Sequence, residues 1–347
     1  MNMVDIHSHF LPRTWPDLAA RFGTPEWPWM RHGADGKAML MVGEREFRPV
    51  GSACWDAALR LEQMDRDRVE VQIMCVTPLL FAYHRPAAQA LECARIFNDA
   101  ARELCAHAPR RLKSLCQVPL QDTDLACREV SRAMGDGHIG VQIGNHVGAR
   151  ELNDEGIISF LQHCASEGAA VFVHPWDMMA QERMPKYQLP WLVSMPAETQ
   201  LSILWLILSG AFERLPRSLK LCFAHGGGSF PYLLGRVDNA WRHRDIVRED
   251  CPQLPSSYVE RFYVDAAVFS SDALAFLIKT MGEDRVMLGS DYPFPLGEQQ
   301  VGKLIGSDAS LPPRVRGKLL HANATAFFGL DVGAAPMARG LGARRSA

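Results

Sequence analysis

The chain has 347 residues, 48% of them hydrophobic and 22% charged, a composition typical of a globular protein with a large core. Its net charge of -2 gives no basic surface for nucleic acid. No apolar run is expected to approach the length of a membrane span, and the N-terminus shows no secretory signal. We therefore expect no membrane contact. The nine cysteines are scattered and include no CxxC pair, which predicts reduced, buried thiols in a cytoplasmic protein rather than a disulfide framework.

The N-terminal third combines one strand with a long irregular segment. Residues 3–10 are mostly apolar and predict a short strand. Residues 11–54 contain Pro, Gly and Trp, and we interpret them as an insertion over one end of the domain. Within it, residues 37–42 and 46–50 flank Gly43 and predict a hairpin.

From there to the C-terminal tail, helices and strands alternate. The expected strands are 69–76, 113–120, 139–143, 169–174, 219–224, 262–265 and 286–290. The expected helices are 55–67, 86–108, 124–134, 157–166, 197–211, 231–244, 271–281 and 313–328. Eight strands, each followed by a helix, predict a single (β/α)8 barrel over residues 1–332, with an open doubly wound sheet as the alternative. The Gly-, Ala- and Arg-rich residues 333–347 predict a flexible tail.

Polar side chains end several of the predicted strands. His7 and His9 lie two apart on the first strand and share a face. His174 and His225 end two further strands, and Asp291 follows the last one. In a barrel these ends meet at one mouth. Each residue alone could be an ordinary histidine or aspartate, but the set of His7, His9, His174 and Asp291 predicts a site for zinc, or for cobalt or iron.

The order of these residues resembles the amidohydrolase superfamily. Members with two metal ions usually bridge them with a modified lysine that ends strand four. The corresponding segment here, residues 139–144, reads IGVQIG and contains no lysine. We therefore expect one metal ion per chain.

A narrower resemblance is to the aminocarboxymuconate-semialdehyde decarboxylase family, and to its bacterial members in particular. The stretches that carry it are DIHSHF at 5–10, FRP at 47–49, HPWDM at 174–178, LPWLVSMPAE at 189–198, HGGG at 225–228, GRVDNAWRHRD at 235–245 and SDYPFPLG at 290–297. They extend from the first strand to the last. The HxH and HGGG patterns are shared with related decarboxylases and hydrolases, whereas the Trp- and Arg-rich stretches are narrower markers.

This resemblance implies a carboxy-lyase that needs zinc but neither oxygen nor an organic cofactor. The implied reaction converts 2-amino-3-carboxymuconate 6-semialdehyde to 2-aminomuconate 6-semialdehyde. In the family a metal-bound water is the reacting species, which assigns His225 as the general base that activates it. Asp291 would bind the metal and also orient His225.

The same resemblance assigns residues to the substrate. Arg48 and Arg236 match the carboxylate-binding positions, and the family pattern implies a homodimer in which Arg236 reaches the neighbouring site. From the residues alone, both could be a solvated surface pair. Trp191 and Phe294 match pocket-lining aromatics, with core packing as the alternative.

Three other functions remain open from the sequence. A related enzyme could decarboxylate an aromatic acid such as a hydroxybenzoate. A hydrolase of the same superfamily could open a lactone or an amide. A catalytically silent metal-binding or assembly subunit is the third, and the intact set of His225 plus four ligands argues against it.

Overall fold

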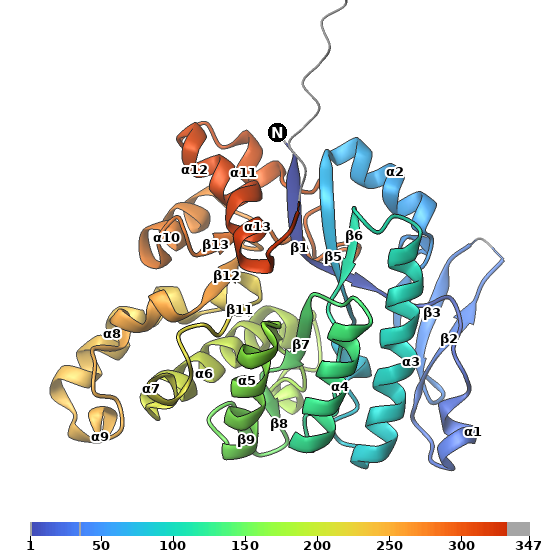
Figure 1. Cartoon of the computed structure of the whole chain (residues 1–347), viewed down its shortest axis with the longest axis horizontal. Helices are drawn as coiled ribbons and strands as arrows, with labels where there is room; N and C mark the ends of the chain where they lie inside the picture. The colour runs from blue at the N-terminus through green and yellow to red at the C-terminus, as the bar shows by residue number, and fades with distance from the viewer. Residues whose placement is uncertain (1, 35, 332–347) are drawn as a thin grey trace, which may run out of the picture.

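Eight parallel strands occupy the centre of the molecule in the computed structural model, which describes residues 2–34 and 36–331 (Figure 1). They are β1 (Met3–Phe10), β5 (Val69–Val76), β6 (Leu112–Ser114), β7 (Gly140–Gly144), β10 (Ala170–His174), β11 (Leu221–Phe223), β12 (Tyr263–Asp265) and β13 (Val286–Met287). Hydrogen bonds join them in two runs, β1-β5-β6 and β13-β12-β11-β10-β7. The predicted tail, residues 333–347, lies outside the described residues.

Backbone contacts at two seams close these runs into a ring. At one seam the Cys116 N–H donates to Gly140 O at 2.9 Å, and Cys116 forms a parallel bridge with Val141. At the other, the Asp291 N–H donates to His7 O at 2.8 Å, and Ser8 forms a parallel bridge with Tyr292. The structure therefore confirms the (β/α)8 barrel rather than the open doubly wound sheet.

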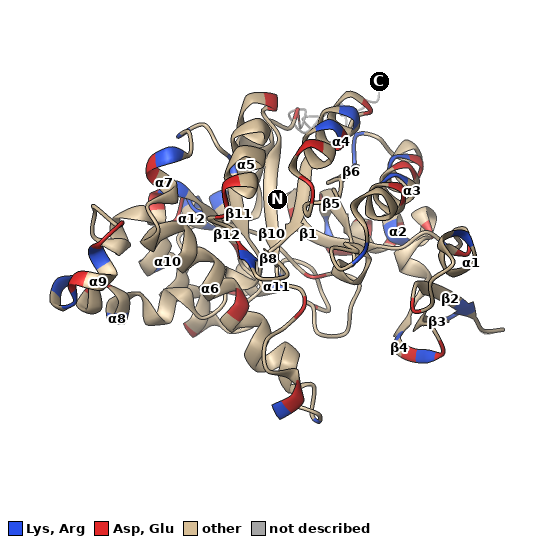
Figure 2. Cartoon of the chain, turned by 90° about the horizontal axis from the view of Figure 1, so that it is seen from below, with Lys and Arg blue, Asp and Glu red and all other residues tan. Residues whose placement is uncertain are grey.

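Helices cover the outside of this ring, one unit after each strand (Figure 1). The longer ones are α2 (Ala57–Asp67), α3 (Ala87–Ala106), α4 (Thr123–Gly135), α5 (Glu155–Glu167), α6 (Met195–Leu208), α8 (Phe230–His243) and α10 (Ser271–Met281). The shorter ones are α1 (Leu18–Phe22), α7 (Ala211–Arg214), α9 (Asp245–Arg248), α11 (Lys303–Ser307), α12 (Pro313–Gly317) and α13 (Asn323–Phe328). The single helix predicted over residues 313–328 is instead divided by a π-helical turn at Lys318–Ala322. Acidic and basic residues are interspersed along α3 and α4 (Figure 2).

The insertion after β1 forms its own antiparallel sheet beside the barrel. The predicted hairpin is present as β3 (Ala38–Val42) and β4 (Arg45–Val50). A third strand, β2 (Pro28–His32), pairs with β3 and was not predicted. Arg85 attaches this sheet to the barrel, because its Nη2 donates to Pro25 O at 2.9 Å and its guanidinium lies 4.8 Å from the Trp27 ring centroid. A small hairpin of β8 (His146–Val147) and β9 (Arg150–Glu151) lies elsewhere on the barrel.

A bulge in β1 decides which side chains face the barrel interior. Val4 and Ile6 pack inside with Phe172. The register with β5 then shifts between Asp5 and Ser8. Strict alternation would turn His7 away from the face of Ile6. The extra residue restores the inward direction, so His7 also contacts Phe172, with ring centroids 4.9 Å apart.

One segment contradicts the expectation that no apolar run approaches the length of a membrane span. By length and composition the helical stretch Pro190–Leu208 is long and apolar enough to cross a membrane, the only such helix in the described part of the chain. It carries the buried Glu198. The Glu198 carboxylate accepts hydrogen bonds from Asn145 Nδ2 at 2.7 Å and from the Met179 N–H at 2.8 Å. These contacts join the stretch to the loops at the barrel mouth.

Candidate active site

The structure brings the four predicted metal ligands together at the C-terminal ends of the strands. One ligand atom from each of His7, His9, His174 and Asp291 lies within 4.8 Å of the others, and all four residues are buried. The Nε2 of His9 lies 3.0 Å from Asp291 Oδ1 and 3.2 Å from the Nε2 of His7. No metal ion is part of this structure, so the fit of these atoms to one rests on their chemistry.

The hydrogen bonds of the three histidines leave the same nitrogen available in each ring. Nδ1 of His7 lies 2.7 Å from Asp265 Oδ2, and Nδ1 of His174 lies 2.8 Å from Pro175 O. Nδ1 of His9 has a longer contact, 3.4 Å, with Val76 O. Because each of these oxygens accepts a hydrogen bond, Nδ1 carries the proton and the Nε2 lone pair is free. Three such nitrogens and one carboxylate fit a divalent ion.

The electrostatics of the cluster also favour a cation at its centre. Burial opposes ionisation of Asp291, but the hydrogen bond with His9 and the nearby imidazoles hold its pKa below the usual range. Burial, reinforced by the charges of neighbouring histidines, keeps the pKa of His174 well below its usual value. The pKa of His7 is raised, because the hydrogen bond and charge of Asp265 outweigh burial. A divalent ion can supply the positive charge that these carboxylates attract.

Asp265 is a site residue that we did not predict. It ends β12 and is completely buried. Besides the contact with His7, its Oδ1 accepts hydrogen bonds from the N–H groups of Gly226, at 2.9 Å, and Ala267, at 3.1 Å. It therefore holds a ligand and the loop after β11 in one arrangement. Its position at the end of a predicted strand, as for the ligands, was a signal that could have identified it.

His225 lies next to the ligands in a strained turn. Its backbone φ is +55°, and its ring centroid lies 4.9 Å from that of His174 and 5.1 Å from that of His7. The Nε2 of His225 is 4.0 Å from Asp291 Oδ2, and its Nδ1 is buried without a hydrogen-bond partner among the described residues. Burial, together with the charge of His7, lowers the pKa of His225 to about 4. Its ring is therefore neutral at pH 7 and can accept a proton.

The loop that follows His225 requires glycine. At Gly228 φ is +60°, and a Cβ added there would lie 2.2 Å from Pro196 O. A side chain would push α6, which begins next to Pro196, away from the site. The HGGG pattern thus has a packing reason besides any chemical one.

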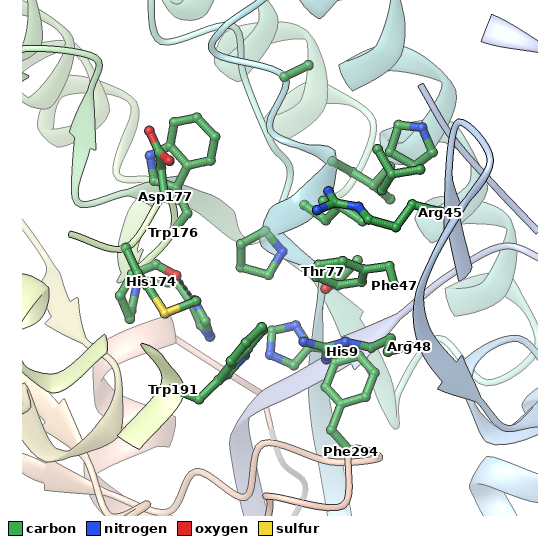
Figure 3. Close-up of a pocket in the computed structure, with 18 of the residues that line it drawn as sticks. His9, Arg45, Phe47, Arg48, Thr77, His174, Trp176, Asp177, Trp191 and Phe294 are labelled. Atoms are coloured by element: carbon green, nitrogen blue, oxygen red, sulfur yellow. Dashed lines mark hydrogen bonds between the residues drawn. The ribbon is translucent and has the colours of Figure 1, made fainter. Parts of the chain in front are cut away.

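A cavity of about 1150 Å³ opens over the ligands. Its wall includes three of the residues predicted to bind substrate, Arg48, Trp191 and Phe294. The guanidinium of Arg48 lies 4.5 Å from the Phe294 ring centroid, and Phe294 in turn lies 5.2 Å from the His9 ring (Figure 3). Burial lowers the pKa of Arg48 from its usual high value. This places a positive charge and aromatic surface directly beside the candidate metal centre.

Arg236 is not part of this wall. It lies on α8 and is exposed, and it is absent from the lining that the described residues give to the cavity. The chain therefore does not bring Arg236 into its own site.

Comparison with known proteins gives a consistent result over nearly the whole chain. The profile of the family described as Amidohydrolase matches residues 4–330. A 2-amino-3-carboxymuconate-6-semialdehyde decarboxylase of Dictyostelium discoideum is 41% identical over 330 residues, which cover 94% of this chain and 92% of that protein. The protein of the same description in Caenorhabditis elegans is 31% identical over 379 residues, which cover 94% of each chain.

The fold is also that of solved decarboxylase structures. One is 5-carboxyvanillate decarboxylase of Novosphingobium aromaticivorans, complexed with manganese and 4-hydroxy-3-methoxy-5-nitrobenzoic acid. It matches with a TM-score of 0.76 at 21% identity, covering 95% of this chain and 96% of that one.

Proposed function

The chain belongs to the amidohydrolase family and is a decarboxylase, and we propose that it acts on 2-amino-3-carboxymuconate 6-semialdehyde to give 2-aminomuconate 6-semialdehyde. The observation that carries this proposal is the position of Arg48, whose charge lies in the cavity beside His9 and Phe294. A guanidinium in such a place suits a carboxylate substrate. Two relatives that are more than 30% identical to the chain carry the name of this activity.

The residues of the site have separate tasks in this reaction. A divalent ion held by His7, His9, His174 and Asp291 would supply a water molecule with a pKa near neutrality. Decarboxylation replaces a carbon–carboxylate bond with a carbon–hydrogen bond, so the product must receive one proton. His225 is neutral and next to the ligands, and we assign it to accept a proton at Nε2 and return it to the substrate. Asp291, 4.0 Å away, helps to orient it.

We propose one zinc ion per chain, with cobalt or iron as other ions that this ligand set accepts. Three nitrogens and one carboxylate support zinc. The residues of β7 that share the interior face support a single ion. Gly144 pairs in register with the ligand His174 and Gln142 with the interior residue Phe172, so neither position offers a bridging lysine. The manganese in the structure from Novosphingobium makes manganese a further metal for the elemental analysis to consider.

We further propose a homodimer in which Arg236 completes the neighbouring site. Arg236 is exposed on α8, outside its own cavity. The same region presents large apolar side chains to solvent: Tyr232 on α8 is 80% exposed and Phe276 on α10 is 42% exposed. Exposed apolar surface of this kind favours association with another chain. A symmetric pair would build two equivalent sites.

The test is the activity of the purified, metal-loaded protein on the semialdehyde. We expect loss of its near-ultraviolet absorbance together with release of one carbon dioxide per substrate. Metal-free protein and the His225→Ala variant are the controls. Release of carbon dioxide from a hydroxybenzoate or from 5-carboxyvanillate, but not from the semialdehyde, would replace this proposal with an aromatic-acid decarboxylase. Opening of a lactone or amide without carbon dioxide would indicate a hydrolase.

A further inference from the structure

A bulge in β4 turns two arginines to the same face. Leu40 of β3 pairs with Arg48, but the next residue, Met41, pairs with Glu46, so Phe47 has no partner in β3. In a regular strand, residues three apart point to opposite faces. The extra residue cancels this offset, as bulges beside active sites commonly do. Arg45 and Arg48 accordingly extend from β4 into the same cavity (Figure 3).

Arg45 lies at the outer part of this cavity, and its side chain is unpaired in the part of the chain that the structure describes. Its side chain is exposed, whereas that of Arg48 is half-buried. Among residues 2–34 and 36–331 it has no hydrogen-bond or ion-pair partner, although Glu46 beside it pairs with Arg31. Acidic and basic residues gather where the chain enters β4 (Figure 2), and Glu26 and Glu44 also line the rim. Arg45 offsets the negative charge that Glu26 and Glu44 bring to this part of the lining, which favours the approach of an anionic substrate.

We propose that Arg45 is a specificity residue that selects dicarboxylates at the entrance of the site. Its guanidinium makes a solvated contact with a substrate carboxylate, in addition to the contact of Arg48. A carboxylate has enough acceptor positions for more than one such contact. The inference rests on the proposed function only in taking the substrate to be a dicarboxylate.

A matched pair of ligands isolates the contribution of the second carboxylate to the binding affinity. Hexa-2,4-dienedioate and hexa-2,4-dienoate share a conjugated six-carbon chain and differ in having two carboxylates or one. Their affinities for the metal-loaded protein are measured by calorimetry at low salt and at about 1 M salt, where charges more than about 3 Å apart are screened. Because no turnover is needed, the result does not depend on which acid the enzyme decarboxylates.

We expect wild-type protein to prefer the dicarboxylate at low salt. Arg45→Gln should reduce this preference about two- to fivefold, the effect of one exposed ion pair, and Arg45→Lys should retain most of it. Arg13→Gln is the control: it removes an exposed arginine of the insertion that does not line the cavity, and the preference for the dicarboxylate should stay unchanged. At high salt the difference between wild type and Arg45→Gln should disappear.

Two results would overturn the inference: a wild-type protein that does not prefer the dicarboxylate, or an unchanged preference in Arg45→Gln at low salt. Equal melting temperatures of the variants show that any change is not a folding effect. If the preference falls as expected but the semialdehyde is not decarboxylated, the proposed substrate is wrong and Arg45 selects another dicarboxylate. If the semialdehyde is decarboxylated and the preference does not change, the proposed function stands and the role of Arg45 does not.

Discussion

His7 and Asp265 form a buried pair, with Nδ1 of the imidazole 2.7 Å from Oδ2 of the carboxylate and both side chains fully inaccessible to solvent. The two residues are 258 positions apart in the chain. The carboxylate fixes the proton on Nδ1 and turns Nε2 toward the other ligands. Its second oxygen holds the N–H of Gly226, next to His225.

Asp265→Asn should weaken metal binding about 10- to 100-fold, the usual cost of losing a partner that orients a metal-binding histidine. The amide can keep one hydrogen bond but no longer attracts positive charge onto His7. Competition with a chelator of known affinity measures the change. Asp272→Asn, at an exposed position on α10, is the control. Equal affinities of Asp265→Asn and wild type would show that Asp265 does not orient the ligand.

Elemental analysis should find about one divalent ion per chain, because one set of four ligands converges here and β7 presents Gln142 to the interior. The protein should be purified without chelator and with zinc in the medium. Two tightly held ions per chain would contradict a single-metal site.

His225→Ala and His174→Ala should differ in what they lose. His225→Ala should retain the metal and lose about 10²- to 10⁴-fold in kcat, the usual contribution of a general base. His174→Ala should lose metal, because it removes one of four ligands. Metal content and decarboxylation rate are measured on the same samples. If His225→Ala loses the metal and His174→Ala keeps it, the two roles have been exchanged.

Arg48→Ala and Arg236→Ala should each be nearly inactive, and mixing them should restore activity if each site uses Arg48 of one chain and Arg236 of the other. With random exchange, about half of the dimers become mixed. Each mixed dimer has one site with both arginines, so about a quarter of all sites should recover. The rate is followed over time after mixing. No recovery despite demonstrated subunit exchange would mean that the arginines do not act across an interface.

His138 should make the protein less stable as the pH falls below neutrality. It is 4% exposed, and burial lowers its pKa to about 4. The unfolded chain, with a histidine pKa near 6.5, binds more protons between pH 6.5 and 4, so stability is present above this range and lost on acidification. From pH 7 to pH 5 the free energy of unfolding should fall by about 2 kcal/mol through this residue.

Urea unfolding of metal-free protein at the two pH values tests this. His138→Gln can preserve the hydrogen bond with Ser114 Oγ, which lies 3.0 Å from His138 Nδ1 in the wild type. Because glutamine does not titrate, this variant should lose less stability than wild type between pH 7 and pH 5. An equal loss in both proteins would mean that His138 does not titrate on unfolding.

The barrel could be predicted from sequence because each strand is a short apolar run with a turn or helix signal at its end. The strand at Met3–Phe10 and the helix at Ser271–Met281 agree with the structure residue by residue. The later strands are shorter than predicted: β13 has two residues, because after Met287 the chain pairs with β1 only through single backbone contacts.

The features that could not be predicted from the sequence depend on the register in which neighbouring strands pair. The bulge in β1 that keeps His7 facing inward and the bulge at Phe47 that turns Arg45 into the cavity are each one extra residue in a pairing. The hairpin pattern specified that β3 and β4 pair, but no local sequence pattern specifies where the extra residue lies, so the face of a side chain after a bulge remains undetermined. Asp265 could have been identified as a site residue from its place at the end of a predicted strand, but its partners could not, because they require β12 to lie beside β11 and near His7.

The seam between His7 and Asp291 determines when the metal site can first exist during synthesis. Its candidate ligands come from residues 7, 9, 174 and 291, so the chain must be made as far as Asp291 before all four exist. The backbone contacts of Asp291 with His7 and of Tyr292 with His9 also wait for this last segment. A chain truncated before Asp291 should therefore lack both the fourth ligand and these contacts of the seam.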